Sequence, residues 1–312
     1  MSFEALDLSR LRPVLPSPLQ PAEDERFARR GVRLLLKRDD LIHPDLPGNK
    51  WRKLAPNLRA AAGRTVLTFG GAYSNHLRAT AAAGRLLGFP TVGVVRGDEL
   101  ADRPLNPSLA RCAADGMTLH FMDRGTYRAK ADPEVLAGLL STYGECCVIP
   151  EGGSNAAAAQ GCTELGQELR GRADVVAVAC GTGGTLAGLA AGLAPGQRAL
   201  GVPVLRGGFL GDAVRELQQE AFGGTAGSWS LDERFHFGGY ARTPPPLHAF
   251  ADDFEQLHGL PVERLYVAKL LYALTTLTEE GAFPPGTTVA AVVTGRPQGL
   301  SSGSDGAPRP GA

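Results

Sequence analysis

A glycine-rich turn, Gly181-Thr-Gly-Gly-Thr185, has the composition of a phosphate-binding loop. It follows an apolar run expected to be a strand, and it opens a stretch expected to be a helix. The glycines at Gly181, Gly183 and Gly184 let backbone N–H groups approach an anion, and a helix N-terminus adds about half a positive charge. The hydroxyl groups of Thr182 and Thr185 supply further donors. The turn therefore predicts a cradle for a phosphate group.

Other interpretations of this turn stay open at this point. A P-loop would carry a lysine, which the turn lacks. The spacing of Gly181, Gly183 and Gly188 is similar to a dinucleotide fingerprint, but the next apolar run, Leu200–Val204, ends without the acid that holds a ribose hydroxyl. The missing acid counts against NAD. An NAD-dependent oxidoreductase remains an alternative, and so does an ordinary tight turn.

Lys50 is a candidate for an amine that captures a carbonyl group. It follows Gly48 in Gly48-Asn-Lys-Trp-Arg-Lys-Leu54, at the expected first turn of a helix. The helix dipole there disfavours an ammonium group and lowers the pKa of Lys50, and the neutral amine is the form that attacks a carbonyl carbon. From position alone, a surface lysine is the simpler interpretation.

A second strand-loop-helix segment, Gly70-Gly-Ala-Tyr-Ser-Asn-His76, carries polar side chains where its helix is expected to begin. Backbone N–H groups at that point, together with the side chains of Ser74 and Asn75, could bind a substrate carboxylate. His76 alone would be interpreted as a structural histidine.

These segments lie at the ends of expected strands. Apolar runs alternate with stretches rich in Ala, Leu and Arg, which is typical of an α/β fold with parallel sheets covered on both faces. The expected strands are Arg33–Lys37, Thr65–Phe69, Thr91–Val95, Thr118–Met122, Cys147–Pro150, Val175–Cys180, Leu200–Val204 and Val289–Thr294. The expected helices include Lys50–Ala62, Asn75–Leu87, Ala156–Arg170 and Gly184–Leu193. Because ligands bind beyond the carboxyl ends of parallel strands, these glycine clusters, with Gly152-Gly153, indicate one site.

Composition excludes several functions. The 312 residues carry 32 basic and 32 acidic side chains, so no net charge points to nucleic acid or a membrane surface as a partner. Neither a membrane span nor a signal peptide is recognisable. Five cysteines and six histidines lack ligand spacing, so we expect no metal site and a reduced, cytoplasmic environment. Phe222–Ser230 is expected to be a surface loop, and residues 301–312 a disordered tail.

Four motifs occur in the order G-N-K-x-R-K-L, G-G-x-x-S-N-H, P-E-G-G-S-N and G-T-G-G-T. Together they resemble the 1-aminocyclopropane-1-carboxylate deaminase / D-cysteine desulfhydrase family of fold type II (tryptophan-synthase-β-like) enzymes, which use pyridoxal 5'-phosphate. The resemblance runs from about Leu34 to about Leu300. It implies two parallel-sheet domains with helices on both faces and the cofactor in the cleft between them. We expect residues 1–53 and 155–300 to form the large cofactor-binding domain, and 54–154 the small domain with the substrate-carboxylate loop.

The resemblance also implies which residues bind the cofactor. Lys50 is similar to the lysine that holds it as a Schiff base, and Asn75 to the residue that hydrogen-bonds its phenolic oxygen. Residues 181–185 would bind the phosphate. In typical cyclopropane deaminases a glutamate contacts the pyridine nitrogen, but here Val267 stands at that position. Thr294 could hydrogen-bond the ring nitrogen instead.

Substrate and catalytic residues follow from the same resemblance. Ser74, with the neighbouring Asn75 and His76, would hold the substrate carboxylate. Tyr240 and Tyr266 are similar to two active-site tyrosines, the second of which can donate or accept a proton. Without the resemblance, either tyrosine would be interpreted as a core aromatic residue.

The departures from the family pattern bear on the substrate. Val267 with Thr294 favours β-elimination from a small amino acid such as D-cysteine, giving pyruvate, sulfide and ammonia. Ring opening of 1-aminocyclopropane-1-carboxylate to 2-oxobutyrate and ammonia remains an alternative. A non-catalytic protein that binds pyridoxal phosphate also remains, since Val267 and Arg296 are both unusual; Arg296 could meet the phosphate or a substrate acid, or point outward. A homodimer is the expected assembly.

Overall fold

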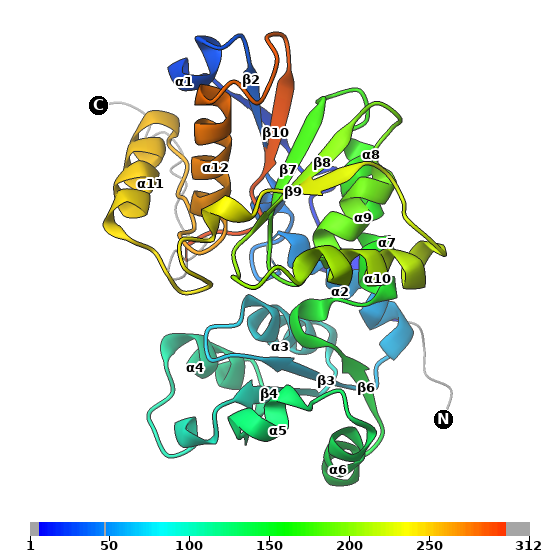
Figure 1. Cartoon of the computed structure of the whole chain (residues 1–312). Coiled ribbons are helices and arrows are strands. Elements are labelled where there is room, and N and C mark those ends of the chain that lie inside the picture. The colour runs from blue at the N-terminus through cyan, green and yellow to red at the C-terminus, as the bar shows by residue number, and fades with distance from the viewer. Residues whose placement is uncertain (1–5, 47, 298–312) are drawn as a thin grey trace, which may run out of the picture.

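The chain forms two β-sheets in the computed structural model, which describes residues 6–46 and 48–297 (Figure 1). The larger sheet has six strands in the order β1-β2-β10-β7-β8-β9, and the smaller has four in the order β5-β4-β3-β6. The strands of the larger sheet are β1 (Leu19–Ala22), β2 (Arg33–Lys37), β7 (Val175–Cys180), β8 (Arg198–Pro203), β9 (Trp229–Leu231) and β10 (Thr288–Val292). Those of the smaller sheet are β3 (Thr65–Gly70), β4 (Thr91–Arg96), β5 (Met117–Met122) and β6 (Cys146–Ile149).

All the expected strands are present, within one or two residues at each end. Every pairing is parallel except that of β1 with β2, which is antiparallel. The edge strand β1 contains Pro21, which an edge position tolerates because one side of the strand needs no ladder hydrogen bond. The loop expected at Phe222–Ser230 is wrong in part, since β9 begins at Trp229. A three-residue strand is too short to show a periodic pattern.

Helices cover both faces of the larger sheet because β7 is apolar on both sides. Ala177 packs in one buried cluster with residues of α11 and α12, and Val178 in another with residues of α8, α9 and α10 (Figure 1). These helices are α1 (Glu25–Ala28), α7 (Ala156–Gly161), α8 (Thr163–Glu168), α9 (Gly184–Gly192), α10 (Leu210–Phe222), α11 (Pro245–His258) and α12 (Val267–Glu279). The helix expected at Ala156–Arg170 is therefore divided into α7 and α8, with Cys162 between them.

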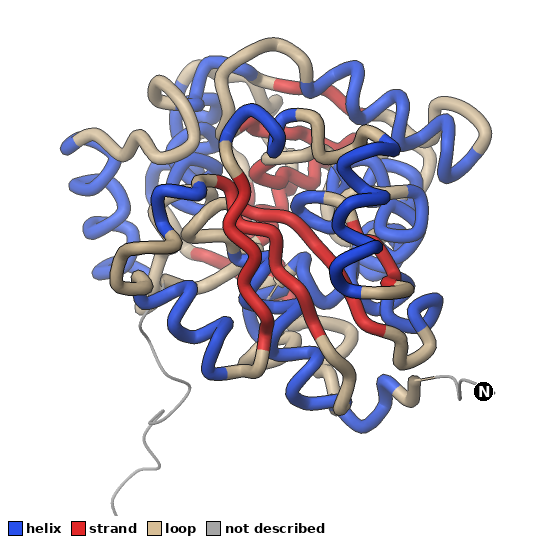
Figure 2. The backbone as a smooth tube through the Cα atoms, turned by 90° about the horizontal axis from the view of Figure 1, so that it is seen from below, coloured by secondary structure: helices blue, strands red, loops and turns tan. Residues whose placement is uncertain are grey.

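The smaller sheet is formed entirely by the middle of the chain and is also covered on both sides (Figures 1 and 2). Its apolar side chains join buried clusters with α2 and α3 on one side and with α5 and α6 on the other. Its helices are α2 (Asn49–Ala61), α3 (Asn75–Leu87), α4 (Pro107–Ala114), α5 (Arg124–Arg128) and α6 (Pro133–Tyr143). Helix α2 spans the expected domain boundary at residue 53, and the predicted tail at 301–312 lies outside the described residues.

Candidate active site

The glycine turn has the geometry of an anion cradle at the N-terminus of α9. Gly183 caps this helix with φ +81°, a conformation that side-chain-bearing residues rarely adopt, and a Cβ atom there would lie 2.9 Å from Cγ2 of Val214. The first N–H groups of α9 have no partner within the helix. Thr185 is tied to the start of α2, because Asn49 Nδ2 donates to Thr185 Oγ1 at 2.9 Å. The turn predicted as a cradle is thus joined to the helix that carries Lys50.

Lys53 supplies the cation that this turn lacks. Its side chain is 2% exposed, and its ammonium group donates to Ser154 Oγ at 2.7 Å, to Gly152 O at 3.2 Å and to Thr182 Oγ1 at 3.4 Å. Burial lowers the pKa of Lys53, and no carboxylate among the described residues offsets that effect. An ammonium group surrounded by hydroxyls and helix N–H groups is a donor set suited to a phosphate dianion.

Lys50 lies one turn before Lys53 on the same side of α2. Burial, and secondarily the charge of Lys53, lowers the pKa of Lys50 to about 7. The expected direction is confirmed, although the sequence attributed it to the helix dipole. Gly48 brings the lysine against the end of β10: its φ is +66°, and a Cβ atom there would lie 1.5 Å from the carbonyl oxygen of Thr294. Only glycine fits this approach, which places Thr294 beside the lysine loop.

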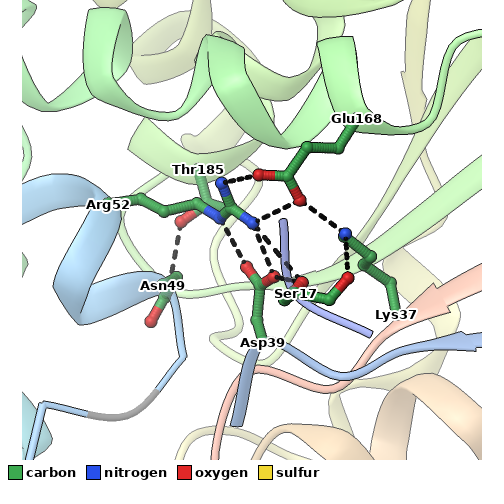
Figure 3. A network of polar contacts seen from close by, with 7 residues as sticks. All are labelled: Ser17, Lys37, Asp39, Asn49, Arg52, Glu168 and Thr185. Carbon is green, nitrogen blue, oxygen red and sulfur yellow. Dashed lines mark hydrogen bonds and ion pairs between the residues drawn. The ribbon is translucent and has the colours of Figure 1, made fainter. Parts of the chain in front are cut away.

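A buried network of charges anchors α2 to the larger sheet (Figure 3). The Arg52 guanidinium bonds both oxygens of Asp39, at 2.8 and 2.9 Å, and both oxygens of Glu168, at 2.9 and 3.0 Å. Lys37 pairs with Glu168 and donates to the carbonyl oxygen of Ser17 at 2.6 Å, while the Ser17 hydroxyl donates to Asp39. Two cations and two carboxylates balance, so the network fixes the helix without leaving a net charge.

Tyr240 and Tyr266 meet beside the glycine turn. Their rings are T-shaped, with centroids 5.7 Å apart, and a Cβ atom on Gly181 would lie 3.4 Å from the Tyr266 hydroxyl. Burial raises the pKa of both phenols, and that of Tyr266 rises well above its usual value of 10.0. Both hydroxyls therefore keep their protons near neutral pH and can act as hydrogen-bond donors.

The loop before α3 places Ser74 and Asn75 at the helix start, as the sequence predicts. Ser74 caps α3, accepting a hydrogen bond from the N–H of Leu77 at 3.3 Å, and Asn75 is half-buried. His76 is 1% exposed, and its Nε2 lies 2.8 Å from Thr68 Oγ1. Burial, with the charges of Lys50 and Lys53, lowers its pKa well below 6.5, so the ring is neutral. Substrate binding by these residues stays a prediction.

Val267 and Arg296, the two residues that depart from the family pattern, lie in different environments. Val267, the first residue of α12, is fully buried in the apolar cluster that α11 and α12 form with the larger sheet. Arg296 Nε donates to Asp40 Oδ2 at 3.2 Å, and Arg38 binds the same carboxylate. This contact ties Arg296 to Asp40, and a role for Arg296 toward the phosphate or a substrate acid stays a prediction.

Other classes of site find little support. Within residues 6–46 and 48–297, no group of three or more His, Cys, Asp or Glu residues could hold a metal ion. All five cysteines are free thiols. No helix of the described chain is long and apolar enough to cross a membrane.

Comparison with known proteins shows the family and the cofactor. The family model described as "Pyridoxal-phosphate dependent enzyme" matches residues 11–295. The chain belongs to this family. It therefore uses pyridoxal phosphate as its cofactor, and the alternative of an NAD-dependent oxidoreductase is dropped.

Two curated relatives and one solved structure sharpen the comparison. The chain is 34% identical over 181 residues to the mitochondrial bifunctional D-cysteine desulfhydrase/1-aminocyclopropane-1-carboxylate deaminase of Arabidopsis thaliana, covering 52% of this chain and 45% of that protein. It is 35% identical over 198 residues to the D-cysteine desulfhydrase of Yersinia pestis, covering 56% and 58%. The alignments thus span about half the length of these relatives. A crystal structure described as an ACC deaminase homologue matches with a TM-score of 0.78 and 25% identity, covering 94% of this chain and 92% of that one. The fold type II architecture is confirmed.

Several residues of the site were not identified from the sequence. Lys53 and Arg52 lie in the recognised motif around Lys50, and Ser154 in the P-E-G-G-S-N motif, but no role was assigned to them. The signal was their place in those motifs. Their partners, which come from distant segments, become apparent only in the fold.

Proposed function

We propose that this enzyme is a lyase acting on a small amino acid, and that its main reaction converts D-cysteine and water to pyruvate, sulfide and ammonia. One observation carries the proposal: a lysine amine with a pKa of about 7 stands one helical turn from a buried ammonium group at a phosphate cradle. An amine of that pKa is reactive with carbonyl compounds at neutral pH.

The residues present fit pyridoxal phosphate. Lys53, the hydroxyls of Thr182 and Ser154, and the first N–H groups of α9 would hold the phosphate. Lys50 would hold the cofactor covalently, Asn75 would hydrogen-bond its phenolic oxygen, and Thr294 would hydrogen-bond its ring nitrogen. When bound, the cofactor supplies an electron sink for the carbon next to the amino group.

The protein's own groups would move the protons. A neutral Lys50 amine can accept the proton from the substrate Cα. The Tyr266 hydroxyl, which stays protonated at neutral pH, can donate a hydrogen bond to the departing sulfur, and Tyr240 packs against its ring. The N–H groups and side chains at Ser74 and Asn75 would hold the substrate carboxylate.

Elimination is favoured over cyclopropane ring opening because of the surroundings of Val267. This side chain is sealed in the apolar core and offers no carboxylate to hold a ring nitrogen in its protonated form. A neutral hydroxyl such as that of Thr294 can instead donate to an unprotonated nitrogen. The weaker electron sink suits a reaction in which a leaving group departs at once. 1-Aminocyclopropane-1-carboxylate deamination is the second candidate, because the Arabidopsis relative carries both names.

Turnover of both substrates on one preparation tests this proposal. We expect kcat/KM for pyruvate and sulfide release from D-cysteine to exceed that for 2-oxobutyrate release from 1-aminocyclopropane-1-carboxylate, with L-cysteine as the stereochemical control. Lys50→Ala should reduce turnover by about 10³-fold or more, since the amine moves the proton. It should also abolish borohydride trapping of the cofactor on the protein. A preference for the cyclopropane substrate would reverse the order of the two candidates, and a trappable Lys50→Ala protein would remove Lys50 from the mechanism.

We further propose a cytoplasmic homodimer in which residues 1–53 and 155–300 form the cofactor-binding domain and 54–154 the small domain. The division of the strands between two sheets supports these boundaries. Light scattering of the purified enzyme tests the dimer: a monomer mass would contradict it.

A further inference from the structure

Lys269 is a buried lysine in the first turn of α12, three residues after Tyr266. Its side chain is 0% exposed. The ammonium group donates to the carbonyl oxygens of Gly239 at 2.8 Å, of His236 at 3.0 Å and of Tyr240 at 3.4 Å. All three acceptors belong to one short segment, residues 236–240, which carries Tyr240. Lys269 thus joins the backbone of one active-site tyrosine to the helix that follows the other.

The position of this lysine is unfavourable in isolation. A cation in the first turn of a helix opposes the helix dipole, and burial of an ammonium group is costly unless its hydrogen bonds are satisfied. Burial lowers the pKa of Lys269 to about 8. Its sequence neighbours on α12, Ala268 and Leu270, are both apolar and fully buried. A residue that served packing alone would be apolar here.

Glu263 binds the backbone beside the second active-site tyrosine, Tyr266. Its side chain is 6% exposed, and its carboxylate accepts hydrogen bonds from the N–H of Tyr266 at 2.7 Å, of Leu265 at 2.8 Å and of Val267 at 3.3 Å. An anion at a helix N-terminus is favourable, and it offsets part of the cost of the nearby ammonium. Glu263 therefore fixes the backbone of Tyr266, while Lys269 fixes that of Tyr240.

We propose that Lys269 is a positioning residue for catalysis, which holds Tyr240 against Tyr266 through the carbonyl groups of residues 236–240. The inference rests on the proposed function only in that Tyr240 and Tyr266 are taken to serve the reaction. Lys269 acts through the two tyrosines and does not touch the substrate. Neither Lys269 nor the carbonyl groups that it binds lie on the glycine turn. We therefore expect the binding of the cofactor phosphate not to depend on this clamp, the set of bonds from Lys269 to residues 236–240.

The test replaces Lys269 by Met, which keeps the unbranched apolar chain and removes the ammonium group. Thr275→Val on the same helix is the matched control: Thr275 is buried, but its hydroxyl donates only to Leu271 O of its own helix, at 3.0 Å. Both variants are made alone and in a Tyr240→Phe background. Hydrogen exchange of residues 236–242, cofactor affinity and kcat are measured on each holoenzyme.

In Lys269→Met we expect faster exchange in residues 236–242, cofactor affinity within about twofold of the wild type, and kcat reduced by about tenfold, as for a misplaced catalytic group. In the Tyr240→Phe background the same substitution should lower kcat no further, because residues that act as a unit are not additive. Thr275→Val should show none of these effects.

Unchanged exchange in residues 236–242, or an equal loss of kcat in both backgrounds, would overturn the clamp. A wild-type enzyme that turns over neither amino acid would instead overturn the proposed function, and the exchange measurement would still decide whether Lys269 holds the segment.

Discussion

The first turns of α2 have two buried sides that treat charge in opposite ways. On one side, Arg52 lies between Asp39 and Glu168, and every charge has an opposite partner within 3 Å (Figure 3). On the other, Lys50 and Lys53 lie close together, and no carboxylate of the described chain acts on the pKa of either. The difference separates structure from function: the paired side fixes the helix, and the unpaired side is suited to an anion and to a reactive amine.

The energetics of the two sides differ accordingly. A buried ion pair roughly balances desolvation against attraction, so its net contribution is small, but removing one partner leaves an uncompensated charge. Two neighbouring amines without a carboxylate partner gain no such compensation, and their pKa values are lowered. Any single substitution on the paired side should therefore lower the free energy of unfolding. Loss of a charge on the unpaired side should impair function but should not lower the free energy of unfolding.

The largest expected effect on stability comes from breaking the paired side. Arg52→Met leaves Asp39 and Glu168 buried with too few partners, and should lower the free energy of unfolding by about 3–5 kcal/mol. Arg29→Met is the control, because Arg29 is 64% exposed and 4.0 Å from Glu25; it should cost less than about 0.5 kcal/mol. Urea unfolding of both variants measures the difference. Equal losses would mean that the network contributes nothing beyond an exposed pair.

A smaller effect, on function alone, is expected for the unpaired side. Lys53→Met removes the cation at the cradle and should weaken pyridoxal phosphate binding by about tenfold or more, corresponding to a charge-assisted hydrogen bond. Without cofactor, the variant should be at least as stable as the wild type, because a buried ammonium group with only neutral partners has gone. Equilibrium dialysis measures the affinity for pyridoxal phosphate, and urea unfolding measures the stability of the cofactor-free proteins. Undiminished affinity would show that the phosphate lies elsewhere.

Much of this arrangement could be predicted from the sequence, because local patterns determine it. The strand β7 is a continuous apolar run, and the turn at residues 181–184 has glycine where φ is positive. Lys50 stands in a short motif at a helix start. These features depend on neighbours within a few residues, and the prediction placed each of them correctly.

The contacts between distant segments could not be predicted in the same way. Lys53 finds Ser154 across about a hundred residues of chain, and Lys269 finds the carbonyl of Gly239 only because α12 packs beside that loop. Likewise, burial and the charge of Lys53 lower the pKa of Lys50, and both depend on the tertiary fold, whereas the sequence suggested only the helix dipole. Sequence motifs predicted Lys50 as the reactive amine, and packing lowers its pKa.

A pH dependence of stability is expected to isolate Lys50. Its pKa is about 7 in the folded protein against 10.5 for a free lysine, so between these values the unfolded chain binds more protons than the folded one. Stability of the cofactor-free enzyme should therefore rise with pH above about 7 and be independent of this group below it. Lys50→Met should lose that contribution, which is at most about 1.4 kcal/mol per pH unit.

The pKa values of Lys53 and Lys269 are also lowered, and both residues contribute to the slope in either protein. Urea unfolding of both proteins between pH 6 and pH 9 measures the difference in slope, and parallel curves would mean that the folded protein leaves Lys50 charged like a surface lysine.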